Sequence, residues 1–296
     1  MLHCVFVSLA LSVPVSAAPT CPEGALLSFK DAVVEGCSVR RLDQVEVPLT
    51  AEGKPVRLEG EVRKLRWSHR PNVPLKELVR RAQQQLEAKG FTLIFVRPEG
   101  SLTTLAARRD LAPEAYVLAE MESFNLGEKL VAEVLEVRNA PFAPKLEKRP
   151  EENKRDAKGC LEPLGLGRVT AGVLDSCEPM RFGEVELPLD EKTKRAQEGE
   201  VFRVRFTHQE STSPLEVIRA YAASLADARF AVVHQGVDGN ERWLTATRDA
   251  NGREEWVHVA SGAINGGELT QTYLTVVRSS PLPVGEGTGE GTNHSL

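Results

Sequence analysis

Two histidines at matching positions are the residues whose chemistry first stands out. His69 ends the run EGEVRKLRWSH, and His208 ends the closely similar run EGEVFRVRFTH. An imidazole can act as a general base or as a contact that responds to pH near neutrality. Neither histidine has an Asp, Cys or Ser nearby in a recognisable catalytic arrangement, and each falls on the apolar face of its run. We therefore expect partly buried histidines with satisfied hydrogen bonds, and a binding or catalytic role is the alternative.

The same two runs carry a stripe of basic residues. It comprises Lys64 and Arg66 next to Arg63 in the first run, and Arg203 and Arg205 in the second. Such a stripe could bind an anionic polymer of the bacterial envelope. Charged side chains on a solvated strand also discourage aggregation between sheet edges, and that interpretation requires no ligand.

Four cysteines remain when Cys4, which lies in the N-terminal segment, is set aside. Cys21 and Cys37 open the first half of the chain, and Cys160 and Cys177 open the second with nearly the same spacing. An even number of cysteines in matched pairs predicts two disulfides, Cys21 to Cys37 and Cys160 to Cys177. Each loop closure would stabilise the fold by about 3 kcal/mol. No CxxC pair or close Cys/His cluster favours a metal site instead.

Known catalytic and cofactor motifs do not occur in the sequence. GxSxG, the Walker pattern and HExxH are absent, and Gly165-Leu166-Gly167 lacks the preceding strand and third glycine of a dinucleotide fingerprint. The net charge of −5 provides no electrostatic footprint for nucleic acid. We therefore predict no catalytic residues, no metal or other cofactor, and no nucleic-acid partner.

The N-terminus has the pattern of an export signal. Residues 5–17 carry no charge and end in Val15-Ser16-Ala17, the small residues that a signal peptidase requires. The stretch is too short to span a bilayer, which takes about 20 apolar residues. We expect cleavage after Ala17, a mature chain without a transmembrane segment, and a periplasmic or extracellular location in a bacterium.

An internal repeat organises the rest of the chain. VEVPL at 45–49 matches VELPL at 185–189, and the run 59–69 aligns residue for residue with 198–208. The match continues from 77–80 to 216–219 and, less closely, to the end of each copy. Repeated segments of this length predict one domain present twice.

Each copy is expected to contain two strands, one helix and then three or four further strands. Pro214 suits the first turn of a helix that Ser213 caps, and the first-copy helix should end at Gly90. Strands are predicted at 91–96, 102–107, 115–121 and 130–137, and at 230–233, 243–247, 255–260 and 269–277. The predicted class is α+β, with each domain a largely antiparallel sheet that has one main helix on one face.

Composition sets the predicted domain boundaries. The segment 139–159 is rich in Pro, Gly and mixed charges, as in a solvated linker, and the Gly/Glu/Thr-rich end is typical of disorder. The prediction is a signal peptide at 1–17, repeat domain 1 at 18–138, a linker at 139–159, repeat domain 2 at 160–280 and a disordered tail at 281–296.

The second copy resembles a known family in two motifs. DSCEPMRFGEVELPL at 175–189 and LEVIRAY at 215–221, followed by Leu225 and Phe230, are similar to the uncharacterised domain found ahead of the OmpA-type peptidoglycan-binding domain in some bacterial outer-membrane proteins. This sequence differs in having two copies and no peptidoglycan-binding domain. The resemblance implies residence in the cell envelope and assigns no functional residue.

Export, duplication and the lack of a catalytic grouping predict a non-enzymatic envelope protein. Its partner would be another envelope component, either a protein or a glycan. One alternative is a secreted hydrolase whose catalytic carboxylates the sequence does not single out. Another is a structural remnant of a longer OmpA-type protein, with no ligand.

Overall fold

A computed structural model gives the architecture of the chain. It describes residues 24–30, 32–48, 50, 55–69, 73–125, 128–139, 142–147, 156–158, 160, 163–209 and 211–279. The predicted signal peptide, Cys21 and the predicted tail lie outside these residues. The signal, the Cys21–Cys37 disulfide and the disorder of the tail therefore stay predictions.

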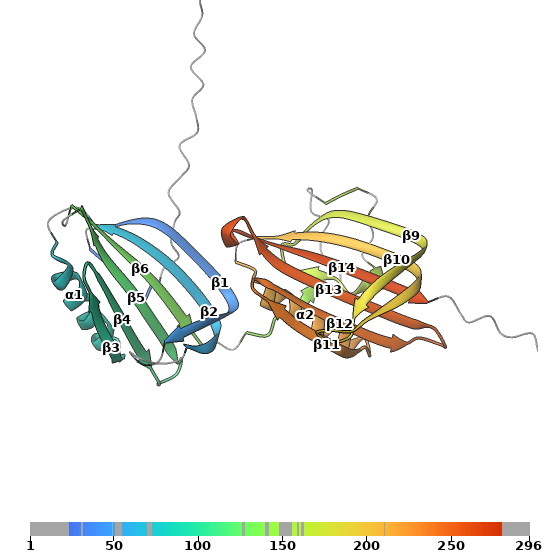
Figure 1. Cartoon of the computed structure of the whole chain (residues 1–296), viewed down its shortest axis with the longest axis horizontal. Helices are drawn as coiled ribbons and strands as arrows, with labels where there is room; N and C mark the ends of the chain where they lie inside the picture. The colour runs from blue at the N-terminus through green and yellow to red at the C-terminus, as the bar shows by residue number, and fades with distance from the viewer. Residues whose placement is uncertain are drawn as a thin grey trace, which may run out of the picture. The chain divides into compact units, whose positions relative to one another are not determined.

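The first sheet has six strands in the order β1-β2-β6-β5-β4-β3 (Figure 1). The strands are β1 (Ala32–Pro48), β2 (Pro55–His69), β3 (Thr92–Glu99), β4 (Leu102–Arg109), β5 (Ala115–Phe124) and β6 (Lys129–Arg138). Helix α1 (Leu75–Ala88) follows β2 and contacts β3 and β4. Buried Leu78, Leu86, Leu105 and Met121 mark the core between this helix and the sheet.

The second sheet repeats this topology strand for strand, in the order β9-β10-β14-β13-β12-β11. The strands are β9 (Val173–Pro188), β10 (Lys194–His208), β11 (Ala231–Asp238), β12 (Glu241–Asp249), β13 (Glu254–Ile264) and β14 (Leu269–Ser279). All their pairings are antiparallel. Helix α2 (Pro214–Asp227) contacts β11 to β14 and buries Tyr221 and Leu225 against them. The predicted pair of similar, largely antiparallel sheets is confirmed.

The predicted α+β class gives helix too much weight. In the described part of the chain, α1 and α2 are the α-helices, whereas strands form most of the regular structure. The outer strands β1 and β9 begin well before the VEVPL and VELPL runs at which the repeat is recognisable in the sequence. Their early residues alternate weakly because many are half-buried, so hydrophobic periodicity alone did not reveal these strands.

The helix boundaries follow from their capping residues. Ser213 Oγ accepts the backbone N–H of Glu216 at 3.1 Å, and Pro214 occupies the first turn of α2, as predicted. Helix α1 begins after Pro74 without a side-chain cap. Gly90 follows the end of α1 with φ +78°, a conformation that glycine adopts without strain.

Part of the predicted linker belongs structurally to the second copy. Strand β7 (Leu146–Glu147) pairs with β8 (Arg168–Val169), and Leu146 is buried in the core beneath α2. The carboxylate of Asp156 accepts hydrogen bonds from Nη1 and Nη2 of Arg168, both at 2.8 Å. Within the described portion of 139–159, Leu146 and Asp156 are therefore anchored to the second copy, while the linker's boundaries stay a prediction.

The predicted disulfide between Cys160 and Cys177 is present, with the Cα atoms 5.6 Å apart. It joins the start of the second copy to β9. Among the residues that the structure describes, no helix is both long and apolar enough to cross a bilayer.

The chain divides into two compact units, and the division runs through the first sheet. One unit contains Arg63–Arg109 and Val117–Glu136. The other contains Val39–Val62 and Asp110–Tyr116 together with the second copy. The two sites described below lie one in each unit.

Candidate functional site

His69 lies at the end of β2 and is buried, with 4% of its surface exposed. Its ring meets that of Phe29 edge to face, with the ring centroids 5.2 Å apart. Phe29 also contacts the indole of Trp67 at 5.9 Å. The segment 24–30 thus lies across the end of β2 and brings an aromatic ring onto the histidine.

An open cavity of about 300 Å³ adjoins His69 and α1. Phe29 and Leu78 form an apolar floor with the imidazole, whereas Lys30, Arg81 and Gln84 contribute polar groups. Among the residues that the structure describes, the lining consists of Phe29, Lys30, His69, Leu78, Arg81, Gln84, Gln85 and Ala88. A concave site that combines an apolar floor with a few polar groups is typical of ligand binding.

Hydrogen bonds from three side chains hold the segment 24–30, which forms one wall of the cavity. Gln85 on α1 accepts the N–H of Ser28 at 3.2 Å and donates to its carbonyl at 2.8 Å. Oε1 of Glu136, a fully buried carboxylate on β6, accepts the N–H groups of Leu26 and Leu27 at 2.6 and 3.2 Å. Lys89 donates to the carbonyl of Leu26. The wall is therefore fixed to both the helix and the sheet.

The helix side of the cavity carries excess positive charge. Glu77 accepts two hydrogen bonds from Arg80 at 2.7 Å and one from Nε of Arg81 at 2.8 Å. Its hydrogen bonds to Arg80 and Arg81 hold the pKa of Glu77 at about 2. One carboxylate thus faces two guanidinium groups, and Lys30 adds a further cation at the cavity.

His208, the counterpart of His69, lies in a filled environment. Its Nε2 is 3.0 Å from Thr272 Oγ1, and Gly172 lies so close that a Cβ there would meet the ring at 2.8 Å. Burial lowers the pKa of His208 to about 4, with a smaller contribution from the positive charge of Arg168. His208 is consequently neutral at pH 7 and packs as part of the interior.

The two helices agree at core positions and differ at the cavity. In the repeat alignment, Leu78 corresponds to Val217, and Leu86 corresponds to Leu225. Arg81 and Gln84, which line the cavity, correspond to Ala220 and Ala223. Over α2, Leu166 and Val169 pack into the core directly. The first copy has therefore acquired polar side chains where the second copy has small ones.

The basic stripe lies on the exposed face of the sheets, and most of its members have acidic neighbours. Arg66 pairs with Glu35 at 3.2 Å and with Glu133 at 2.6 Å, and the matching Arg205 pairs with Asp175 at 3.5 Å. Arg203 lies 3.7 Å from Glu178, and Lys64 is exposed. Cross-strand ion pairs of this kind stabilise a sheet modestly. Lys64 and Arg66 alternate with buried Leu65 and Trp67, so these two cations and His69 lie on opposite faces.

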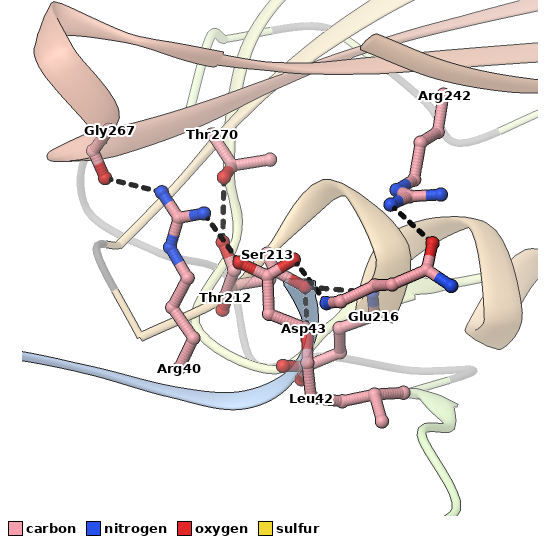
Figure 2. A network of polar contacts seen from close by, with 10 residues as sticks. Arg40, Leu42, Asp43, Thr212, Ser213, Glu216, Arg242, Gly267 and Thr270 are labelled. Carbon is pink, nitrogen blue, oxygen red and sulfur yellow. Dashed lines mark hydrogen bonds and ion pairs between the residues drawn. The ribbon is translucent and has the colours of Figure 1, made fainter. Parts of the chain in front are cut away.

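Sequence reasoning missed a second polar site, which lies in the unit containing 39–62 and α2 (Figure 2). Nη2 of Arg41 on β1 donates to Oε1 of Glu216 on α2 at 2.5 Å, and Ser213 Oγ donates to the carbonyl of Leu42. Arg40 donates one hydrogen bond to the carboxylate of Asp43 at 2.8 Å and another to the carbonyl of Gly267 at 2.9 Å. The Ser213-x-x-Glu216 spacing of a capping box was the available signal. It predicts a contact of Glu216 with its own helix, whereas the structure pairs it with Arg41.

Within the described ranges, no group of three or more His, Cys, Asp and Glu side chains could hold a metal ion. The six candidate binding residues of the sequence are divided equally between the two units. His69 alone among them lines the cavity, and His208 is enclosed.

Comparison with known proteins adds little to this description. No protein-family model matches the chain, and no curated protein matches it in sequence. The apo structure of immunity protein TplEi of T6SS from Pseudomonas aeruginosa is 10% identical, covering 86% of this chain and 84% of that one at a TM-score of 0.21. A tesB protein of Mycobacterium avium subs paratuberculosis is 11% identical over 73% of this chain and 93% of its own, at a TM-score of 0.14. TM-scores this low support no statement about function.

Proposed function

We propose that this chain is an exported, non-catalytic protein of the bacterial envelope that binds a ligand in the cavity beside His69. The observation that carries the proposal is the divergence of the two copies at this place. Arg81 and Gln84 line the cavity where the second copy has alanines, although the core positions of the same helices remain apolar. Two alanines would give a helix at these positions equally well, so stability of the helix does not account for the change.

The chemistry of the lining favours binding over turnover. The described residues that form the cavity include neither a carboxylate nor a hydroxyl or thiol nucleophile. General acid–base catalysis by a carboxylate pair, which the alternative of a secreted hydrolase requires, needs two acidic side chains that these lining residues do not supply. A fixed wall and an apolar floor are sufficient for recognition of a ligand.

Export is supported by the Cys160–Cys177 disulfide, because such bonds persist in oxidising compartments. The predicted signal peptide and the resemblance to the domain that precedes OmpA-type peptidoglycan-binding domains favour the same location. The proposal places the mature chain in the periplasm or outside the cell, with an envelope component as the source of the ligand. Fractionation of cells that produce the full chain, with mass spectrometry of the mature N-terminus, tests this location.

The binding function is tested by a screen of the mature chain against peptidoglycan fragments, glycans, peptides and small organic molecules. Ligands should shift the NMR signals of the His69 ring and the Trp67 indole, because both lie at or beside Phe29. The Cys160–Cys177 region, in the other copy, should not respond. Turnover of any compound that a single carboxylate substitution abolishes would contradict the proposal.

A further inference from the structure

We propose that the cavity beside His69 binds a carboxylate that carries one apolar group about the size of a phenylalanine or leucine side chain. The inference rests on the proposed binding function and specifies its ligand. A small organic acid and the C-terminal residue of a peptide both present this chemistry, and the experiment below separates the two.

The charges around the cavity select an anion. Arg81 uses Nε to bond Glu77, and no other hydrogen bond of its guanidinium occurs within the described part of the chain. Its Nη1 and Nη2 groups are therefore available for the parallel pair of bonds that arginine makes to a carboxylate. Glu77 is already shared with Arg80, so it cannot neutralise both arginines. Lys30 provides a second cation at the same cavity.

The apolar floor requires a hydrophobic group next to that anion. Phe29, Leu78 and Ala88 line the cavity together with the imidazole of His69, which meets Phe29 edge to face. Leu78 is fully buried beneath this floor, so a flat or branched apolar group would displace water from the exposed parts of Phe29 and Ala88 and contact an aromatic ring. An inorganic anion without an apolar group would not displace water from this apolar part of the lining.

The volume limits the size of the ligand. About 300 Å³ is at the small end of ligand pockets, so it accommodates one side-chain-sized group and a carboxylate but not a folded partner. The anchoring of 24–30 by Gln85 and Glu136 keeps this volume formed without a ligand. A preformed site of this kind loses little conformational entropy on binding.

The test uses the mature chain and a matched series of probes. These are 3-phenylpropanoate, the corresponding amide and amine, and the peptide N-acetyl-Ala-Ala-Phe with a free or an amidated C-terminus. Binding is measured by calorimetry and by the NMR shifts of His69 and Trp67. The acid should bind at least ~10-fold more tightly than the amide, because a charge-assisted bond to Arg81 is lost in the amide.

Two substitutions on α1 provide the control. Arg81→Glu reverses the charge at the cavity and should abolish the preference for the acid. Arg80→Glu removes an arginine of similar exposure that also pairs with Glu77 but does not line the cavity, and the preference should survive. Circular dichroism of both variants verifies that α1 remains folded.

The outcomes separate the ligand class from the function. Equal binding of acid and amide at His69, or binding of only a neutral glycan there, would overturn the carboxylate while the binding function stands. If neither this series nor any compound of the wider screen binds at the cavity, the carboxylate ligand and the binding function would both be overturned. Tighter binding of the free-ended peptide than of the small acid would identify a peptide C-terminus as the source, and the reverse order would identify a small organic acid.

Discussion

Nη2 of Arg41 lies 2.5 Å from Oε1 of Glu216, and the carboxyl side chain of Glu216 is 1% exposed. The backbone N–H of the same glutamate is bonded to Ser213, so the carboxyl group is fixed at the start of α2. Burial raises the pKa of Glu216 to about 7, and the nearby charge of Arg41 opposes the shift only in part. Desolvation therefore outweighs the ion pair at this site.

Glu216 should make the stability of the chain decrease as the pH rises. The pKa of an unfolded glutamate is about 4.3, whereas that of Glu216 in the folded state is about 7. Between these two pH values the folded state therefore binds more protons than the unfolded state does. The contribution of the protonated group is complete below the unfolded pKa and is lost as the pH rises through the folded pKa. The difference in unfolding free energy between wild type and Glu216→Gln should change by up to about 4 kcal/mol across this window. Urea unfolding at a series of pH values measures it.

Glu77→Gln is the matched control, because Glu77 occupies the same helical position in α1. Its pKa is lowered to about 2 by Arg80 and Arg81, so it titrates below the window. Its stability difference from wild type should stay flat from about pH 4.3 to 7. Parallel profiles for wild type and Glu216→Gln would contradict the assignment for Glu216.

His208 and His258 should have the opposite effect on stability. Burial lowers the pKa values of His208 and His258 to about 4, so the folded state disfavours their charged forms. Their contribution is complete above the unfolded pKa of about 6.5 and is lost as the pH falls towards about 4. NMR titration of the rings should show both neutral at pH 6. A midpoint near 6.5 for His208 would show that its pocket admits water.

Removal of the second-copy disulfide should destabilise the fold substantially. The bond joins residues 17 positions apart, and the double variant Cys160→Ser, Cys177→Ser should lose about 3 kcal/mol of unfolding free energy. Denaturant unfolding measures the loss. Peptide mapping without reduction should recover Cys160 linked to Cys177 and also tests the predicted Cys21–Cys37 bond. A fragment that links Cys21 to Cys160 would contradict both pairings.

Replacement of Glu136 should open the cavity wall. Glu136→Val leaves two buried N–H groups, those of Leu26 and Leu27, without their acceptor and should cost about 2–4 kcal/mol. Hydrogen exchange of these two amides should accelerate, and ligand affinity at the cavity should fall. Glu136→Gln keeps one oxygen acceptor and should have an intermediate effect. Unchanged exchange in Glu136→Val would show that other contacts hold the wall.

The basic stripe should contribute little to stability. Arg66 and Arg205 are about half exposed and pair with acidic residues across the strands, so Arg66→Gln and Arg205→Gln should each cost less than about 1 kcal/mol. The effect should diminish further in high salt. A salt-sensitive loss of envelope binding in these variants, with stability unchanged, would instead support the stripe as a binding surface.

Local chemistry in the sequence determined the helices and most of the inner strands of this protein. The alternation in 198–208 predicted β10, and Ser213 with Pro214 predicted the start of α2, because periodicity and capping depend on residues only a few positions apart. The similarity of the two halves predicted two similar sheets, since similar sequences fold alike. The matched cysteine spacing predicted the Cys160–Cys177 bond for the same reason.

The tertiary structure decided which of these elements meet, and with them the two sites. Glu136 reaches Leu26 across 110 positions, and Arg41 reaches Glu216 across 175. No local pattern encodes such contacts, because they depend on the strand order and on the path of a short segment over the sheet. Arg81 and Gln84 look like ordinary exposed helix residues in the sequence. Only the position of Phe29 and Lys30 opposite them makes a cavity, because its volume depends on how distant side chains fill the space between a helix and a wall.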